Sequence, residues 1–170
     1  MQRMISGTER VLMVMLTVLC IACFPVNPLV LTGVLQPGYF LPAFVLGWLV
    51  WGIGMVLVLA PIVLFPRRGG VARGDSFVHT TQLVDSGIYS LVRHPQYLGG
   101  ILSIFVATPL LYPHWLFVAL GIPGAAILYW SAHEEEKLLV SRFGDAYRSY
   151  MRRVPRMDLV SGVIRRLTTR

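Results

Sequence analysis

Long apolar stretches constrain this chain more than any other feature of its sequence. Four stretches approach or exceed the ~20 apolar residues that a helix needs to cross the hydrocarbon core of a membrane. They are residues 11–31, 39–65, 97–112 and 115–132. Hydrophobic residues make up 55% and charged residues 14% of the 170 positions, a balance outside that of soluble domains. We therefore predict an all-α, polytopic membrane protein with about four transmembrane helices.

The distribution of charge predicts the topology. All 15 basic and all 8 acidic residues lie before residue 11, between residues 66 and 97, or after residue 132. The connections at 32–38 and 113–114 carry no Lys, Arg, Asp or Glu. Because positively charged segments stay on the cytoplasmic side, both termini and the site described below are expected in the cytoplasm. The net charge of +7 then faces anionic membrane lipids and requires no nucleic acid.

The length is that of a single domain, which we predict to be integral to the membrane over residues 1–170. Three parts are distinguished within it. Residues 1–66 form an N-terminal two-span region, and residues 67–96 form a cytoplasmic loop that carries the motif Arg-His-Pro. Residues 97–170 form a helical hairpin, expected to be the catalytic part, with a C-terminal cytoplasmic segment.

Proline and apolar spacing predict irregular helices near the end of the chain. Pro109 is expected to interrupt the third span and Pro123 to break the fourth, because proline removes a helical hydrogen bond. Residues 133–151 are predicted to form one amphipathic cytoplasmic helix. Its apolar face comprises Leu139, Phe143, Tyr147 and Tyr150. Glu135 lies four residues before Leu139, so we expect it to lead this face and to point inward.

Two clusters of polar residues flank the predicted hairpin. They comprise Tyr89, Arg93, His94, Tyr97, Glu135 and Glu136. A hairpin between them would bring both clusters to one membrane surface, where ionisable groups are costly and usually functional. Guanidinium, imidazole, phenol and carboxylate groups together suit a zwitterionic, nucleotide-like ligand.

Each of these residues also has a simpler explanation when taken alone. His94-Pro95 is typical of a helix start, and the glutamates are typical of the solvated end of a membrane helix. Tyrosines near a membrane are often interfacial anchors. The other histidines have no partner at ligand spacing, so no metal site is expected. Neither G-x-G-x-x-G nor the P-loop pattern is present, which argues against a Rossmann-bound cofactor and against ATP.

The two clusters belong to longer motifs with a family resemblance. The first follows G-x-Y-x-x-x-R-H-P-x-Y-x-G with Gly87, Tyr89, Arg93, His94, Pro95, Tyr97 and Gly99. The second has Glu135, Glu136, Leu139, Phe143, Gly144, Tyr147, Tyr150, Val154 and Arg156. In order and spacing, residues 83–156 resemble the isoprenylcysteine carboxyl methyltransferase and phospholipid methyltransferase superfamily.

This resemblance implies an integral membrane methyltransferase that uses S-adenosylmethionine. The acceptor would be lipophilic or a small molecule delivered by the membrane. The implied cofactor-binding residues are Tyr89, Arg93, His94, Pro95, Tyr97, Gly99, Glu135 and Glu136. The implied catalytic residues are Glu135 and Arg156, with Arg156 near the acceptor headgroup. The reacting atom of the acceptor (oxygen, nitrogen or sulfur), the oligomeric state and the pathway are left open.

Two other functions stay open at this point. An NADPH-dependent membrane reductase of the sterol-reductase type has a similar hairpin, and basic residues at 67, 68 and 73 would suit its 2′-phosphate. A non-catalytic membrane scaffold would tolerate the loss of His94 and Glu135. Cofactor binding separates the methyltransferase from the reductase.

Overall fold

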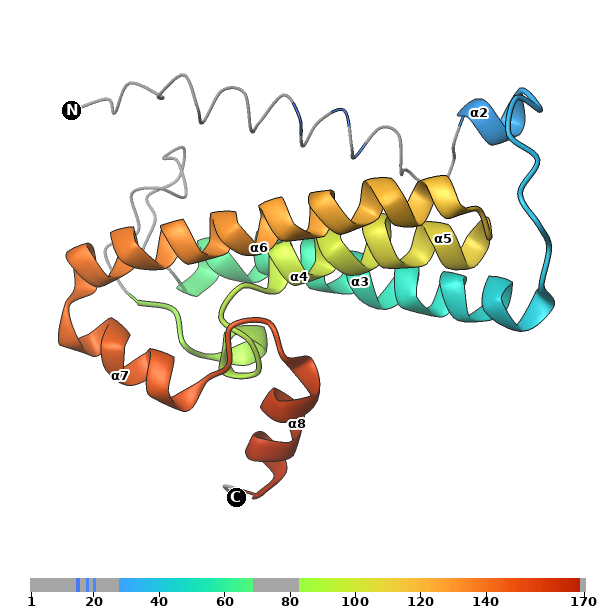
Figure 1. Cartoon of the computed structure of the whole chain (residues 1–170). Helices are drawn as coiled ribbons and strands as arrows, with labels where there is room; N and C mark the ends of the chain where they lie inside the picture. Colours follow the sequence, from blue (N-terminus) through green and yellow to red (C-terminus); the bar gives the residue numbers. More distant parts are fainter. Residues whose placement is uncertain (1–14, 16–17, 19, 21–27, 69–82, 169–170) are drawn as a thin grey trace. The chain divides into compact units, whose positions relative to one another are not determined.

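The structure is a computed structural model that describes residues 15, 18, 20, 28–68 and 83–168 (Figure 1). Most of the first predicted span, 11–31, lies outside the described residues, as do Arg73 and His79. Every regular element in the described part of the chain is a helix. The predicted all-α class is confirmed to that extent.

The helices have the following bounds, and the α labels are those of Figure 1. They are α2 (Pro28–Leu31), α3 (Leu41–Arg68), η2 (Gly87–Ser90), α4 (Pro95–Gly100), η3 (Ile101–Val106), α5 (Ala107–Leu111), α6 (Trp115–Phe143), α7 (Asp145–Arg153) and α8 (Leu159–Thr168). η2 is a single 3₁₀ turn and η3 is π-helical.

Two helices in the described part are long and apolar enough to cross a membrane. They are the Leu41–Pro61 part of α3 and the whole of α6. The continuous apolar run Pro95–Leu111, where the third span was predicted, is shorter. Four spans therefore stay a prediction, which these two helices support only in part.

The chain divides into two compact units, each built from two separate stretches of sequence. One comprises Met1–Gly54 with Gly100–Trp130, and the other comprises Met55–Gly99 with Ser131–Arg170. The described residues of the first include no Asp, Glu, Lys or Arg, so we call it the apolar unit. The second, called the polar unit, holds all the predicted site residues.

Pro109 shapes the apolar unit. Proline lacks an N–H, and its ring clashes with the carbonyl four residues earlier, here that of Phe105. The preceding turn widens into the π-helix η3, in which the Ala107 N–H donates to the carbonyl of Leu102, five residues back. The predicted interruption at Pro109 is therefore a change of helix type. The widened turn presents the Phe105 ring to Gly124 and its carbonyl to Gly121.

The prediction that Pro123 breaks the fourth span is wrong. Helix α6 runs without interruption from Trp115 to Phe143 with Pro123 inside it. A proline removes only one hydrogen bond, and packing of the neighbouring turns can retain the helix. Here Gly121 and Gly124 lie against Phe105, and Phe105 and Phe117 are the buried pair of the apolar core.

The prediction of one helix over residues 133–151 is also wrong. Helix α6 ends at Phe143, and α7 starts at Asp145 after Gly144, whose φ of 56° is left-handed. Glycine adopts this conformation without the clash that a Cβ would cause. The predicted apolar face nevertheless comes together. Leu139, Phe143, Tyr147 and Tyr150 lie in one core cluster with Val154.

Helix α8 packs closely on the segment that precedes the Arg-His-Pro motif. Gly162 lies directly against the backbone carbonyl of Leu91, where a Cβ would overlap the oxygen. Asp158 caps the helix, because its Oδ1 accepts from the Ser161 N–H at 3.0 Å. The Arg165 guanidinium donates to the carbonyl of Arg152 at 3.3 Å.

We predict that Gly162→Ala destabilises the protein, whereas Gly52→Ala does not. Alanine favours helix over glycine by about 1 kcal/mol, and nothing surrounds a Cβ at Gly52. At Gly162 the added methyl meets a backbone carbonyl that cannot rotate away, and overpacking costs about 1–3 kcal/mol. Thermal unfolding of both variants in detergent measures the difference. Equal midpoints would contradict the close approach of α8 to Leu91.

Candidate functional site

The site in the polar unit is closed by backbone hydrogen bonds between the two sequence motifs. The Arg93 N–H donates to the carbonyl of Pro155 at 3.0 Å, and the His94 N–H donates to that of Arg156 at 3.1 Å. The phenol of Tyr150 donates to the carbonyl of Tyr89 at 2.6 Å. Because the bonds of Arg93 and His94 use main-chain atoms of both motifs, they fix how these two residues face the C-terminal segment.

His94 stands at the start of α4. Its carbonyl accepts from the Leu98 N–H at 3.1 Å, and Pro95 takes the first helical position, where its missing N–H removes no helical bond. Both His94 and Pro95 are buried. The His94 ring lies edge-on to the Tyr97 ring, with centroids 5.7 Å apart. The helix start thus orients the imidazole toward the interior of the polar unit.

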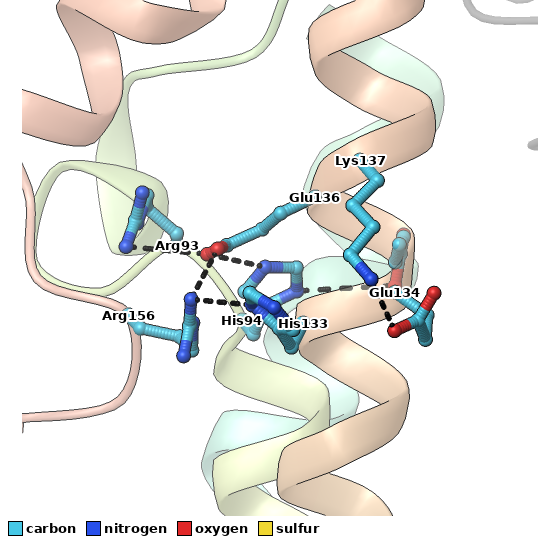
Figure 2. A network of polar contacts seen from close by, with 8 residues as sticks. Arg93, His94, His133, Glu134, Glu136, Lys137 and Arg156 are labelled. Atoms are coloured by element: carbon cyan, nitrogen blue, oxygen red, sulfur yellow. Dashed lines mark hydrogen bonds and ion pairs between the residues drawn. The ribbon is translucent and has the colours of Figure 1, made fainter.

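The centre of the site is the carboxylate of Glu136, whose side chain is 3% exposed (Figure 2). Its Oε1 lies 3.2 Å from both the Arg93 Nη2 and the His94 Nε2. Its Oε2 accepts from the Arg156 Nη2 at 2.6 Å. An anionic carboxylate has no proton to donate, so His94 is the donor in their bond. One buried carboxylate therefore holds three nitrogen groups.

The buried charges at this centre do not balance. Arg93, which is buried, and Arg156, which is 21% exposed, each carry a positive charge, and Glu136 is the one buried carboxylate that contacts them. The Arg93 side chain is 8% exposed, and its Nε and Nη1 have no hydrogen-bond partner among the described residues. Buried donors without acceptors are energetically costly. The arrangement therefore suits the binding of a further anionic group next to Arg93.

Glu135 occupies the more open side of the site. Its carboxylate is 43% exposed and lies 3.8 Å from the His94 Nδ1. The expectation that Glu135, rather than Glu136, points inward is therefore wrong. Glu136 precedes Val140 by four and Phe143 by seven residues, and both of these belong to the same core cluster. The buried face of α6 thus includes Val140 as well as Leu139, and it is wider than the face predicted from the sequence.

Tyr89 and Tyr97 of the first motif lie close enough to Glu135 for its negative charge to raise the pKa of their phenols. Burial, and secondarily the negative charge of Glu135, raises the pKa of Tyr89 to about 12. The phenol of Tyr89 therefore stays neutral at physiological pH. Together with Tyr97, it places aromatic and hydrogen-bonding surface beside a half-exposed carboxylate.

His133 is a site residue that the sequence analysis missed. Its Nδ1 accepts from the Arg156 Nη2 at 3.0 Å, which requires an unprotonated Nδ1. Arg156 is thereby held between His133 and Glu136 (Figure 2). His133 lies three residues before Glu136 and so shares its helix face, a spacing that was visible in the sequence.

All nine predicted site residues lie in the polar unit, but they differ in their surroundings. Arg93, His94, Glu136 and Arg156 form the buried network, and Glu135 lies beside it. Among the remaining residues, Pro95 and Gly99 are buried in α4. In the described part of the chain, no three His, Cys, Asp or Glu side chains form a metal-binding group. Which of these residues contact a ligand stays a prediction.

The phospholipid methyltransferase family matches residues 42–146 of the chain. The match covers more than half of the sequence and includes every site residue except Arg156. The chain therefore belongs to this family, which confirms the resemblance of its motifs. The family and the apolar helices α3 and α6 together indicate a membrane location.

Several characterised proteins share part of this sequence. Methanethiol S-methyltransferase of Pseudomonas deceptionensis is 27% identical over 112 residues, covering 63% of this chain and 41% of that protein. Methanethiol S-methyltransferase 2 of Bradyrhizobium diazoefficiens is 39% identical over 88 residues, covering 52% and 30%. Protein-S-isoprenylcysteine O-methyltransferase of Xenopus laevis is 30% identical over 120 residues, covering 65% and 41%. The chain thus spans less than half the length of these relatives, and no solved structure matches it.

Adjacent glutamates offer a matched test of the network. We predict that Glu136→Gln destabilises the protein by about 3–5 kcal/mol, because Arg93 and Arg156 lose the charge that compensates them in the interior. Glu134 pairs with Lys137 in an exposed position, so Glu134→Gln should cost less than about 1 kcal/mol. Unfolding in detergent measures both variants. Equal stability of the two would show that the Glu136 network does not support the fold.

Proposed function

We propose that this protein transfers a methyl group from S-adenosylmethionine to a lipophilic or small acceptor delivered by the membrane. The observation that carries the proposal is the buried Glu136 network, with its surplus positive charge and the free donors of Arg93. The relatives named above are methyltransferases, and the family match includes both glutamates of the site.

The residues of the site fit this cofactor. The carboxylate of S-adenosylmethionine would accept hydrogen bonds from the Nε and Nη1 of Arg93. Its negative charge would balance the excess positive charge beside Glu136. Glu135 suits its ammonium group or ribose hydroxyls, and the rings of Tyr89 and Tyr97 suit its adenine or its cationic centre. When bound, the cofactor supplies an activated methyl group on a sulfonium.

The protein's own residues would act mainly by positioning. The buried network fixes Arg93 and His94, and both are shielded from water. Arg156 is 21% exposed and held by Glu136, and it would orient an anionic acceptor headgroup. Alignment and exclusion of water supply much of the acceleration of a displacement reaction. Glu135 is the candidate base for an acceptor that must lose a proton.

The acceptor atom separates two versions of this reaction. Some relatives are named as S-methyltransferases of a thiol, methanethiol, and others as O-methyltransferases of protein S-isoprenylcysteine, whose free α-carboxylate is the corresponding oxygen acceptor in this proposal. A thiol or an amine must lose its proton to react, whereas a carboxylate carries none at neutral pH. A role for Glu135 as a base therefore applies to the first kind of acceptor only.

The topology completes the proposal. All the charged residues of the described chain lie in the polar unit, which includes helix α3 beyond Gly54. The positive-inside rule then supports a multi-pass protein whose termini and site face the cytoplasm.

Titration calorimetry on the detergent-purified chain tests the cofactor. We expect saturable binding of S-adenosylmethionine and no binding of NADPH. Loss of a charged hydrogen bond costs about 1.5–3 kcal/mol, so Arg93→Gln should weaken binding by about 10- to 100-fold. His94→Ala should also weaken it. Arg148→Gln, which changes an exposed arginine paired with Asp145, is the matched control and should bind normally.

Each alternative gives a different result in this titration. Binding of NADPH alone would replace the methyltransferase with the reductase. A folded protein that binds neither compound would favour the scaffold. Binding of S-adenosylmethionine unaffected by Arg93→Gln would place the cofactor elsewhere in the chain.

Transfer of a labelled methyl group identifies the acceptor atom. Methanethiol and an S-prenylated cysteine are offered to the purified protein and to its Glu135→Gln and Glu134→Gln variants. If a thiol is the acceptor, Glu135→Gln should lower kcat by about 100-fold or more, since a general base is lost. With a carboxylate acceptor, the same variant should keep kcat within about threefold, because no proton is removed. Equal loss in Glu134→Gln would contradict a specific role for Glu135.

A further inference from the structure

Helix α8 has an apolar face that the described part of the chain leaves uncovered. Its residues are Val160, Val163, Ile164 and Leu167, exposed by 69%, 39%, 55% and 69%. Their spacing of three, one and three residues makes one continuous stripe along the helix. A ten-residue helix therefore exposes most of its hydrophobic side chains.

The opposite side of α8 is attached to the polar unit. Gly162 lies against the Leu91 carbonyl, and Arg165 donates to the Arg152 carbonyl. At 100° per residue, Gly162 lies roughly 150° around the helix from the centre of the apolar stripe. The stripe is therefore directed away from the unit that holds the helix.

The composition of α8 favours a lipid surface over a protein partner. The stripe is entirely aliphatic, whereas the cores of protein interfaces are enriched in aromatic residues, Met and Arg. Arg166 lies next to the stripe, whereas Arg165 is on the side that contacts the polar unit, and α8 itself contains no acidic residue. An aliphatic face with an arginine beside it matches the acyl chains and anionic headgroups of a membrane surface.

We propose that α8 lies in the membrane interface, with its aliphatic stripe in the lipid and Arg166 among anionic headgroups. The contact of Gly162 with Leu91 then links this interfacial helix to the segment that carries Arg93. Docking of α8 on lipid would hold the polar site at the membrane surface, whatever acceptor it uses.

Spin labels on the full-length protein test this placement. Single cysteines replace Ile164 or Leu167 on the stripe and Thr168 at its edge, in a Cys20→Ala/Cys23→Ala background. The protein is reconstituted into vesicles made from equal amounts of phosphatidylcholine and phosphatidylglycerol. Thermal unfolding of each labelled protein verifies the fold.

We expect the labels at 164 and 167 to be accessible to oxygen and protected from a water-soluble nickel chelate. Their depth should be about 5–10 Å below the phosphates, whereas the label at 168 should be accessible to the chelate. Chelate access to all three positions would overturn the proposal. Protection from both reagents would show that another part of the chain covers α8, and strong coupling between labels would assign the stripe to a second copy. Either result would also overturn it.

Discussion

The polar unit depends on one buried carboxylate. Glu136 is the acceptor for Arg93, His94 and Arg156, which reach it from two separate stretches of sequence. Without this carboxylate, the guanidinium of Arg93 would be buried without a compensating charge, and the partly buried guanidinium of Arg156 would lose its shortest contact. The backbone bonds between residues 93–94 and 155–156 serve the same end, because they hold the cations at the distance the carboxylate needs. The ion pair with Glu136 uses the Nη2 of Arg93, and the Nε and Nη1 keep no hydrogen-bond partner among the described residues. Stability and the proposed cofactor binding therefore draw on the same group.

The described part of the apolar unit is held together by packing and not by charge. Its described residues bury no charge, and its helices are shaped by proline and glycine. The π-helical turn before Pro109 and the small residues of α6 let Phe105 enter the space between neighbouring turns. Exposed apolar side chains on α3 and α6 are the expected complement of lipid, in keeping with the family to which the chain belongs. The proposed chemistry and the expected lipid contact of α3 thus belong to different residues of one short chain.

Much of this arrangement was predictable from the sequence, and the failures have physical causes. The helical class and the pairing of the motifs followed from hydrophobicity and from spacing, and the family followed from the resemblance of the motifs. The break at Gly144 did not, because an apolar repeat continues across a single left-handed glycine. Glu135 and Glu136 are only 100° apart around a helix. Which of the two is buried therefore depends on how wide the packed face of the helix is, and the sequence does not show that width. His133 was missed because its partner, Arg156, is close in space but 23 residues away.

The hydrogen bond from Tyr150 to Tyr89 spans 61 residues of sequence. During synthesis, Arg93 and His94 leave the ribosome well before the helix that supplies Glu136, and before Arg156. Until then their polar groups have no buried partners and must stay in water. The site is therefore assembled last, after the intervening apolar helices have been made. A chain that stalls in that interval would expose a basic segment and an unpaired amphipathic surface, which are features that cellular quality control can recognise.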